Sequence, residues 1–240
     1  MAKARSKGDA ISLADAIGQK RALTRTAPTA LHEQVFDRLR DAVIEGQLAP
    51  GRALTVRGLA AEFDVSTMPA REAIRRLVAM GALELTSTRR LSVATMTDAR
   101  LEEISVARLA LEPDLAKRAC LLVSGDARRK KKLIDELSGI DRALDAAIAK
   151  GDAGEYARQN SRFHMAFYRA SEAVVLLGLV ESLWLRFGPF MRVVVGRIGT
   201  SGLDDDKHKV AISCLNAGDA DGVEEAIRTD IQEGLENIGE

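Results

Sequence analysis

Five polar side chains interrupt apolar helical faces in the second half of the chain. They are Asn160, His164, His208, Asp230 and Arg108. A buried charge is costly unless it is paired or bound to a metal, so such residues should meet one another or a ligand. Imidazole, carboxylate and amide groups bind divalent transition metals, and Asn160 and His164 lie four residues apart on one helical face. We predict that the first four residues hold zinc or a similar divalent ion.

Each of these residues also has a simpler explanation when taken alone. A single histidine on an apolar face is more often a core residue, and Arg108 could pair with Glu112 or with Asp230. A shared pocket is favoured because the residues come from four separate helical segments. Since Arg108 and a metal ion would both be cationic, we expect the pocket to bind a small carboxylate or sugar acid as an effector.

A second pattern, in residues 56–93, is typical of DNA-binding proteins. Apolar residues recur at helical spacing over 56–63, and Asp64 with Val65 forms a turn. Ser66 then stands where the next helix needs an N-cap. The apolar positions of that second helix share one arc, and the residues outside the arc include Arg71, Arg75 and Arg76.

Two short apolar runs follow this second helix. Residues 83–86 and 91–94 flank a polar tip that contains Arg89 and Arg90, which predicts a β-hairpin with a charged end. Two helices, a turn and a basic hairpin in this order predict a winged helix-turn-helix, whose second helix enters the major groove of DNA.

Length and charge indicate how these patterns are organised. The 240 residues suit two domains, and the formal net charge is zero. The charge is unevenly spread: residues 1–100 hold 16 Lys and Arg against 11 Asp and Glu, and the remainder holds 19 against 24. A basic front and an acidic back fit a DNA-binding module joined to another domain.

The chain is predicted to be mainly α. We expect a mobile N-terminal tail over 1–28, a winged helix-turn-helix domain with a small β-hairpin over 29–96, and an all-helical domain over 97–240. The last domain is predicted to be an antiparallel bundle of about six helices. Their expected ranges are 98–122, 126–150, 153–170, 173–196, 204–217 and 220–238.

The remaining features concern the cellular compartment. Cys120 and Cys214 lie in apolar helical patterns without a CxxC motif, so we expect reduced core thiols. No apolar run is expected to be long enough to span a bilayer, and the polar N-terminus lacks the core of a signal peptide. These observations predict a cytoplasmic protein without a membrane partner.

The chain resembles the GntR family of bacterial transcription regulators, in the FadR-type branch with an all-helical effector domain. The resemblance extends from Leu31 to about Asn237. It rests on LHEQVFDRLRDAVIEGQLAPG, LAAEFDVSTMPAREAIRRLVAMGALEL, RLALE at 108–112 and NSRFH at 160–164. It implies a homodimer that binds double-stranded DNA, most often as a repressor, under the control of a small molecule.

The resemblance also implies roles for particular residues. We expect the start of the recognition helix to approach bases or phosphates through Ser66, Thr67, Met68 and Arg71. Phosphate contacts are expected from Arg57, Arg75, Arg89 and Arg90. In metal-binding members an Asp or Asn, a His four residues later and two further His hold the ion, which maps onto the four ligands predicted above. A carboxylate effector often binds both this metal and an arginine like Arg108.

The chain departs from the family pattern at two positions. Thr67 stands where an Arg that can read guanine is common, which implies a different operator sequence. Asp230 stands in place of a histidine, which makes the site harder and more anionic. Two-fold symmetry predicts an inverted-repeat operator.

Two alternative functions are also considered. One is a metal-dependent enzyme acting on a small organic acid, against which stands the lack of an HExxH motif or nucleophile elbow. The other is an architectural DNA-binding protein without an effector, against which stand the polar residues on four inward faces.

Overall fold

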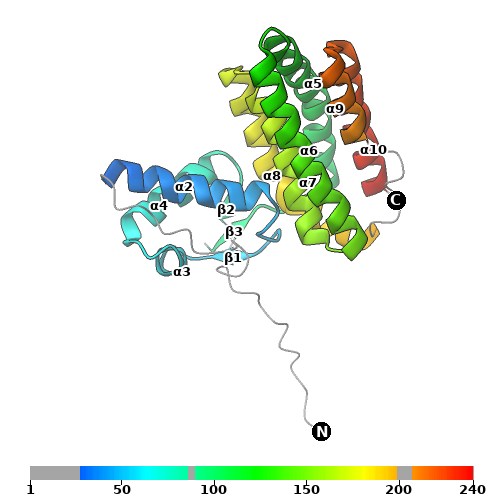
Figure 1. The fold of residues 1–240 in the computed structure, drawn as a ribbon. Helices are drawn as coiled ribbons and strands as arrows, with labels where there is room; N and C mark the ends of the chain where they lie inside the picture. Colours follow the sequence, from blue (N-terminus) through cyan, green and yellow to red (C-terminus); the bar gives the residue numbers. More distant parts are fainter. Residues whose placement is uncertain (1–27, 86–89, 199–206, 240) are drawn as a thin grey trace.

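The computed structural model describes residues 28–85, 90–198 and 207–239. Within them, helices and a small sheet form an N-terminal unit that leads into a bundle of six long helices (Figure 1). The N-terminal elements are α2 (Pro28–Ile44), β1 (Ala53–Leu54), α3 (Val56–Glu62), α4 (Thr67–Ala79), β2 (Leu83–Leu85) and β3 (Leu91–Val93). The predicted mainly α fold class is confirmed. The predicted tail lies almost wholly outside the described residues.

The helix-turn-helix forms where its pattern predicts. The Thr55 hydroxyl caps α3 by accepting a hydrogen bond from the Gly58 N–H, and Asp64 adopts a φ of 51° in the turn. Ser66 precedes α4 in an extended conformation, but its side chain makes no capping hydrogen bond. An N-cap hydroxyl usually accepts from the second or third N–H of the helix. The third residue is Pro69, which has no N–H to donate.

The wing is a three-stranded antiparallel sheet in the order β1-β3-β2. Leu83 pairs with Val93 and Leu85 with Leu91, so the predicted hairpin strands are confirmed. Strand β1 was not predicted because two residues are too short to show an alternating pattern. Arg89 and most of the tip lie outside the described residues, and Arg90 is exposed.

The bundle follows the predicted helices closely. It consists of α5 (Asp98–Ser124), α6 (Ala127–Lys150), α7 (Ala153–Arg169), α8 (Val174–Ile198), α9 (Lys207–Ala217) and α10 (Ala220–Gly239). Each helix end lies within three residues of its predicted position. Helix α5 packs against α7, α8 and α10, and α9 packs against α6 and α10. Cys120 is buried, Cys214 is half-buried, and both are free thiols.

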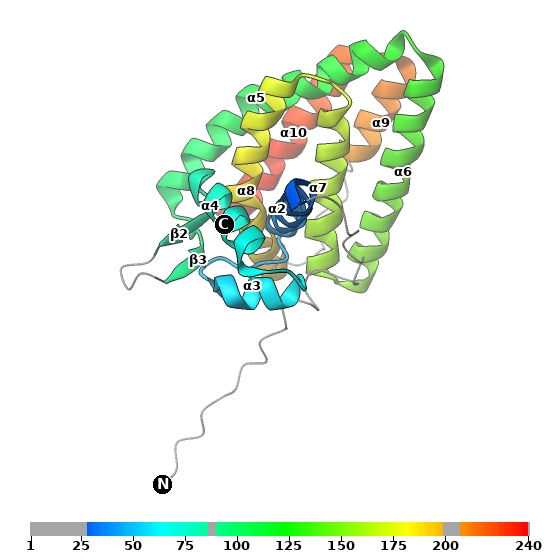
Figure 2. The same ribbon diagram turned by 90° about the vertical axis from the view of Figure 1, so that its left-hand side faces the viewer.

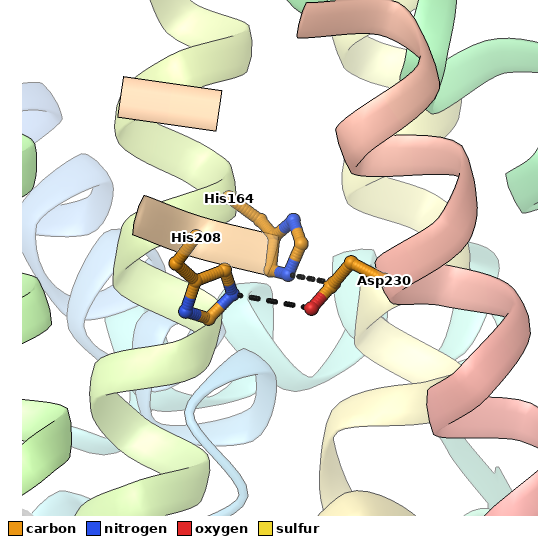
Figure 3. A group of neighbouring side chains, drawn as sticks. All are labelled: His164, His208 and Asp230. Atoms are coloured by element: carbon orange, nitrogen blue, oxygen red, sulfur yellow. Dashed lines mark ion pairs between the residues drawn. The ribbon is translucent and has the colours of Figure 1, made fainter. Parts of the chain in front are cut away.

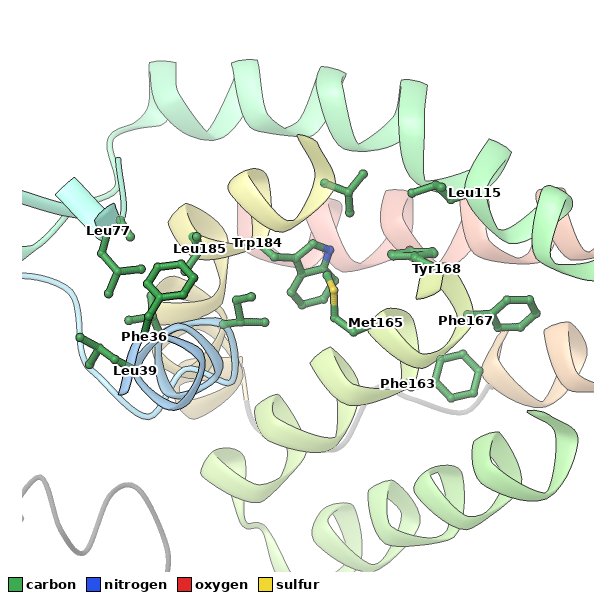
Figure 4. Close-up of a cluster of buried hydrophobic side chains, with 14 of the residues drawn as sticks. Phe36, Leu39, Leu77, Leu115, Phe163, Met165, Phe167, Tyr168, Trp184 and Leu185 are labelled. Atoms are coloured by element: carbon green, nitrogen blue, oxygen red, sulfur yellow. The ribbon is translucent and has the colours of Figure 1, made fainter. Parts of the chain in front are cut away.

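The two units share one continuous core. Phe36 and Leu39 of α2 and Leu77 of α4 join Leu185 and Trp184 of α8 in a single buried cluster that extends to the aromatic residues of α7 (Figure 4). Figure 2 shows α2 end-on beside α7 and α8. The N-terminal unit is therefore packed directly on the bundle.

Helix α8 corrects one expectation. Its segment Val174–Met191 is long and apolar enough to cross a membrane by length and composition, with a mean hydropathy of 1.5. The prediction that no apolar run reaches this length was wrong. One face of α8 supplies Val180, Trp184 and Phe187 to the core. Only 33% of the segment is buried, so much of its apolar surface remains uncovered within the described chain.

Candidate metal and DNA-binding sites

Three of the predicted metal ligands meet in the bundle. His164 of α7, His208 of α9 and Asp230 of α10 have potential ligand atoms that all lie within 4.8 Å of one another. The Nε2 of His164 lies 3.1 Å from Oδ2 of Asp230, and the Nε2 of His208 lies 3.5 Å from Oδ1 of Asp230 (Figure 3). Both histidines are buried, whereas the Asp230 side chain is 24% exposed. Access to this cluster is therefore from the side of Asp230.

The fourth predicted ligand, Asn160, is placed one turn before His164 on α7. Its side chain is buried at 5% exposure. The donor set of two imidazoles, a carboxylate and this amide fits a divalent transition metal. Ligation by Asn160 itself stays a prediction.

Asp230 is held in its ionised form. Burial raises the pKa of this carboxyl, but the positive charges of His208, His164 and Arg108 outweigh that effect and lower the pKa to about 2. The carboxylate is therefore a charged potential ligand at neutral pH.

A hydrogen-bonded chain lies behind the cluster. Tyr168 donates its hydroxyl proton to Oε2 of Glu112 at 2.7 Å, and its oxygen lies 3.0 Å from Nδ1 of His164. Burial raises the pKa of Tyr168 well above its usual value, and the negative charge of Glu112 adds to this effect, so the phenol stays protonated. Because its single proton is donated to Glu112, the tyrosine oxygen can only accept from Nδ1 of His164.

Arg108 forms part of the same network. Its Nε donates to Oε1 of Glu112 at 2.7 Å, and its guanidinium lies 4.7 Å from the ring centre of Trp184 and 4.2 Å from that of Phe187. Pairing with Glu112, the simpler explanation from the sequence, is therefore the arrangement observed. Because Arg108 contributes to the low pKa of Asp230, its positive charge also acts on the metal-ligand cluster.

Sequence reasoning paired Glu112 with Arg108 but missed the roles of Tyr168 and Trp184. Tyr168 lies one turn after His164 on the same helix, so i,i+4 spacing could have indicated that contact. Trp184 donates from Nε1 to Glu112 at 3.1 Å, and no sequence signal links residues so far apart.

Two open grooves lie away from this cluster. One, of about 830 Å³, is lined by parts of α2, α6 and α7, and the other, of about 770 Å³, by parts of α4, β2, α5 and α8. Neither is lined by His164, His208 or Asp230. Both lie where the N-terminal unit meets the bundle.

Most of the predicted DNA-contacting residues are exposed on the N-terminal unit. The exposed members are Arg57, Ser66, Thr67, Met68, Arg71, Arg75 and Arg90. Arg76 also lies outside the apolar arc of α4, but its side chain is only 37% exposed. It turns back to α2, where it pairs with Glu33 at 2.8 Å and stacks over Phe36 at 3.6 Å.

Comparisons with known proteins agree with this architecture. Residues 31–93 match the model of bacterial regulatory proteins of the gntR family, and residues 103–233 match the FCD domain. The HTH-type transcriptional regulator McbR of Escherichia coli is 27% identical over 205 residues, covering 84% of this chain and 90% of McbR. The solved structure of E. coli McbR superposes with a TM-score of 0.76 at 26% identity, covering 87% of this chain and 96% of that one.

Two further relatives are transcriptional repressors. The repressor RspR of E. coli is 22% identical over 216 residues, covering 90% of this chain and 92% of RspR. The gluconate operon repressor of Bacillus subtilis is 30% identical over 161 residues, covering 64% of this chain and 58% of that protein. The family consists of DNA-binding transcription regulators rather than enzymes. With both of its domain models matched, this chain belongs to the gntR family of bacterial transcription regulators, in the branch that carries an FCD domain.

Proposed function

We propose that this regulator is a metal-dependent repressor that senses a small carboxylate or sugar acid and binds an inverted-repeat operator as a homodimer in the cytoplasm. Residues 29–96 form the DNA-binding domain, and residues 97–240 bind the effector and dimerise. The observation that carries the proposal is the convergence of His164, His208 and Asp230, from three helices, within 4.8 Å inside the FCD domain.

The metal is held by these three residues together with Asn160. Zinc or a similar divalent ion would supply positive charge and open coordination positions for a carboxylate. The effector reaches the cluster from the exposed side of Asp230. Arg108 adds a second cation, and the name of the gluconate operon repressor fits the sugar-acid class. Because Glu112 already pairs with Arg108, the effector must share or displace that contact.

The DNA interface consists of the exposed start of α4 together with arginines of α3 and of the wing. Ser66, Thr67, Met68 and Arg71 approach the bases, as expected for the first turn of a recognition helix in the major groove. The cationic residues Arg57, Arg75, Arg89 and Arg90 neutralise phosphates and set the register without reading sequence. Thr67 implies an operator that differs from those read by an arginine at this position.

Dimerisation uses uncovered apolar residues of α8 and α5. Val174, Val175 and Leu179 of α8 are 80%, 79% and 51% exposed, and Val106 of the adjacent α5 is 66% exposed. An apolar surface of this kind on a helical bundle favours a partner, and a second copy gives the two-fold symmetry of an inverted repeat.

The test of the metal site uses the purified protein after removal of metal with a chelator. Zn²⁺ should bind with one ion per chain and raise the melting temperature, since binding to the folded state stabilises it by mass action. His164→Ala should remove both effects. Binding of Zn²⁺ by His164→Ala with unchanged affinity, or no binding by the wild type, would refute the site.

A further inference from the structure

Glu112 accepts hydrogen bonds from three different side chains in the bundle interior. Its carboxylate is fully buried and accepts hydrogen bonds from Arg108 on α5, Tyr168 on α7 and Trp184 on α8. Three elements thus point their donors at one side chain. Because these donors occupy the carboxylate oxygens, the proton of the Tyr168 hydroxyl has a fixed direction, toward Glu112.

That direction determines the chemistry of His164. The tyrosine oxygen accepts from Nδ1 of His164, which places the Nδ1 proton on the side away from Asp230. The other ring nitrogen, Nε2, faces the carboxylate of Asp230 at 3.1 Å. A histidine binds metal through one nitrogen, and the hydrogen bond made by the other selects the tautomer and the ring orientation.

We propose that Tyr168 and Glu112 are positioning residues, which act in series to present Nε2 of His164 to the metal. This inference rests on the proposed metal site and adds two residues that do not touch the ion. In this arrangement Glu112 orients the hydroxyl of Tyr168, and that hydroxyl orients the imidazole. Groups that orient a metal-bound histidine in this way change metal affinity by about 10- to 100-fold when removed.

The experiment compares Tyr168→Phe with Tyr156→Phe. Both variants remove one phenolic hydroxyl from α7 and keep the ring, but only Tyr168 is hydrogen-bonded to His164. Co²⁺ is titrated into metal-free full-length protein and followed by its visible absorption. We expect Tyr168→Phe to weaken Co²⁺ binding by about 10- to 100-fold and Tyr156→Phe to leave it unchanged.

Glu112→Gln tests the serial arrangement. This variant should also weaken Co²⁺ binding, and the double variant with Tyr168→Phe should be little weaker than Tyr168→Phe alone, since residues in one network are not additive. A second readout is independent of metal. In ring ¹⁵N NMR of the metal-free protein, the Nδ1–H of His164 should exchange slowly in the wild type and in Tyr156→Phe, and rapidly in Tyr168→Phe.

The outcomes separate this inference from the proposed function. If the wild type binds no Co²⁺, the metal site itself is refuted. If the wild type binds Co²⁺ and Tyr168→Phe binds it equally well, the positioning role is refuted while the metal site stands. Additive losses in the double variant would refute the serial arrangement.

Discussion

Gly188 of α8 packs directly on the backbone of Ile44 in α2. A Cβ atom at position 188 would lie only 2.1 Å from the carbonyl oxygen of Ile44, so no larger residue fits without moving a helix. Phe187, the preceding residue, covers the guanidinium of Arg108. The junction between the DNA-binding unit and the bundle is thus one residue away from the network behind the His164, His208 and Asp230 cluster.

Gly188→Ala should loosen this junction. Because the methyl group must displace backbone atoms, we expect a loss of about 1–3 kcal/mol in the free energy of unfolding. Metal affinity should stay close to the wild type, while the effect of effector on DNA binding should diminish. Gly178→Ala is the matched control on the same helix, since a Cβ there meets nothing within 4 Å. Equal stability of the two variants in urea denaturation would contradict the packing argument.

Arg71→Ala should weaken selective operator binding without unfolding the protein. Arg71 is exposed near the start of α4, and loss of an arginine contact to a base costs about 1–3 kcal/mol, roughly 5- to 150-fold in affinity. The operator is obtained by selection from random DNA, and binding is measured by gel shift. Arg142→Ala, a change at an exposed arginine of α6, is the control and should bind as the wild type does. Unchanged retention by Arg71→Ala would refute its role.

The structure separates what the sequence could predict from what it could not. The convergence of His164, His208 and Asp230 was predictable, because each interrupts an apolar stripe and such stripes must face a common core. The hydrogen bonds of Glu112 with Tyr168 and Trp184 could not be predicted from the sequence. These partners lie 56 and 72 residues from Glu112, and the contacts depend on how their helices pack together. Arg76 is held against α2 by Glu33 and Phe36, whereas Arg75 is exposed. The pattern of α4 alone could not predict this difference, because both contacts come from another helix.

Glu45 should make the stability of the protein depend on pH. Burial at the junction raises the pKa of this carboxyl above its ordinary 4.5, despite the guanidinium of Arg162 about 4.0 Å away. A raised pKa means that the folded state binds the proton more tightly, so the stability contributed by Glu45 is greatest below pH 4.5 and is lost as the pH rises through the raised value. Glu45→Gln should remove this part of the decline in denaturation curves measured from pH 4 to 7. If the free energy of unfolding changed with pH in the same way in the wild type and in Glu45→Gln, Glu45 would not be the group responsible.

Leu179→Glu should dissociate the proposed dimer. A charge in the centre of an apolar interface costs about 2 kcal/mol or more, which weakens association by about 30-fold. Sedimentation velocity should show a dimer for the wild type and a monomer for the variant. Val210→Glu, at a 43% exposed valine of α9, should remain dimeric. Dimers formed equally well by Leu179→Glu would exclude this face as the interface.

The central claim is that metal and a small acid together control DNA binding. It is tested by fluorescence anisotropy of the selected operator with metal-free protein, with Zn²⁺-loaded protein, and with loaded protein plus a panel of sugar acids and small carboxylates. We expect at least one acid to change the operator affinity of the loaded wild type by about 10-fold or more, within the usual range of allosteric coupling. The same acid should have no effect on His164→Ala or on metal-free protein. An acid response that persists in His164→Ala, or an operator affinity that no acid changes, would contradict the account.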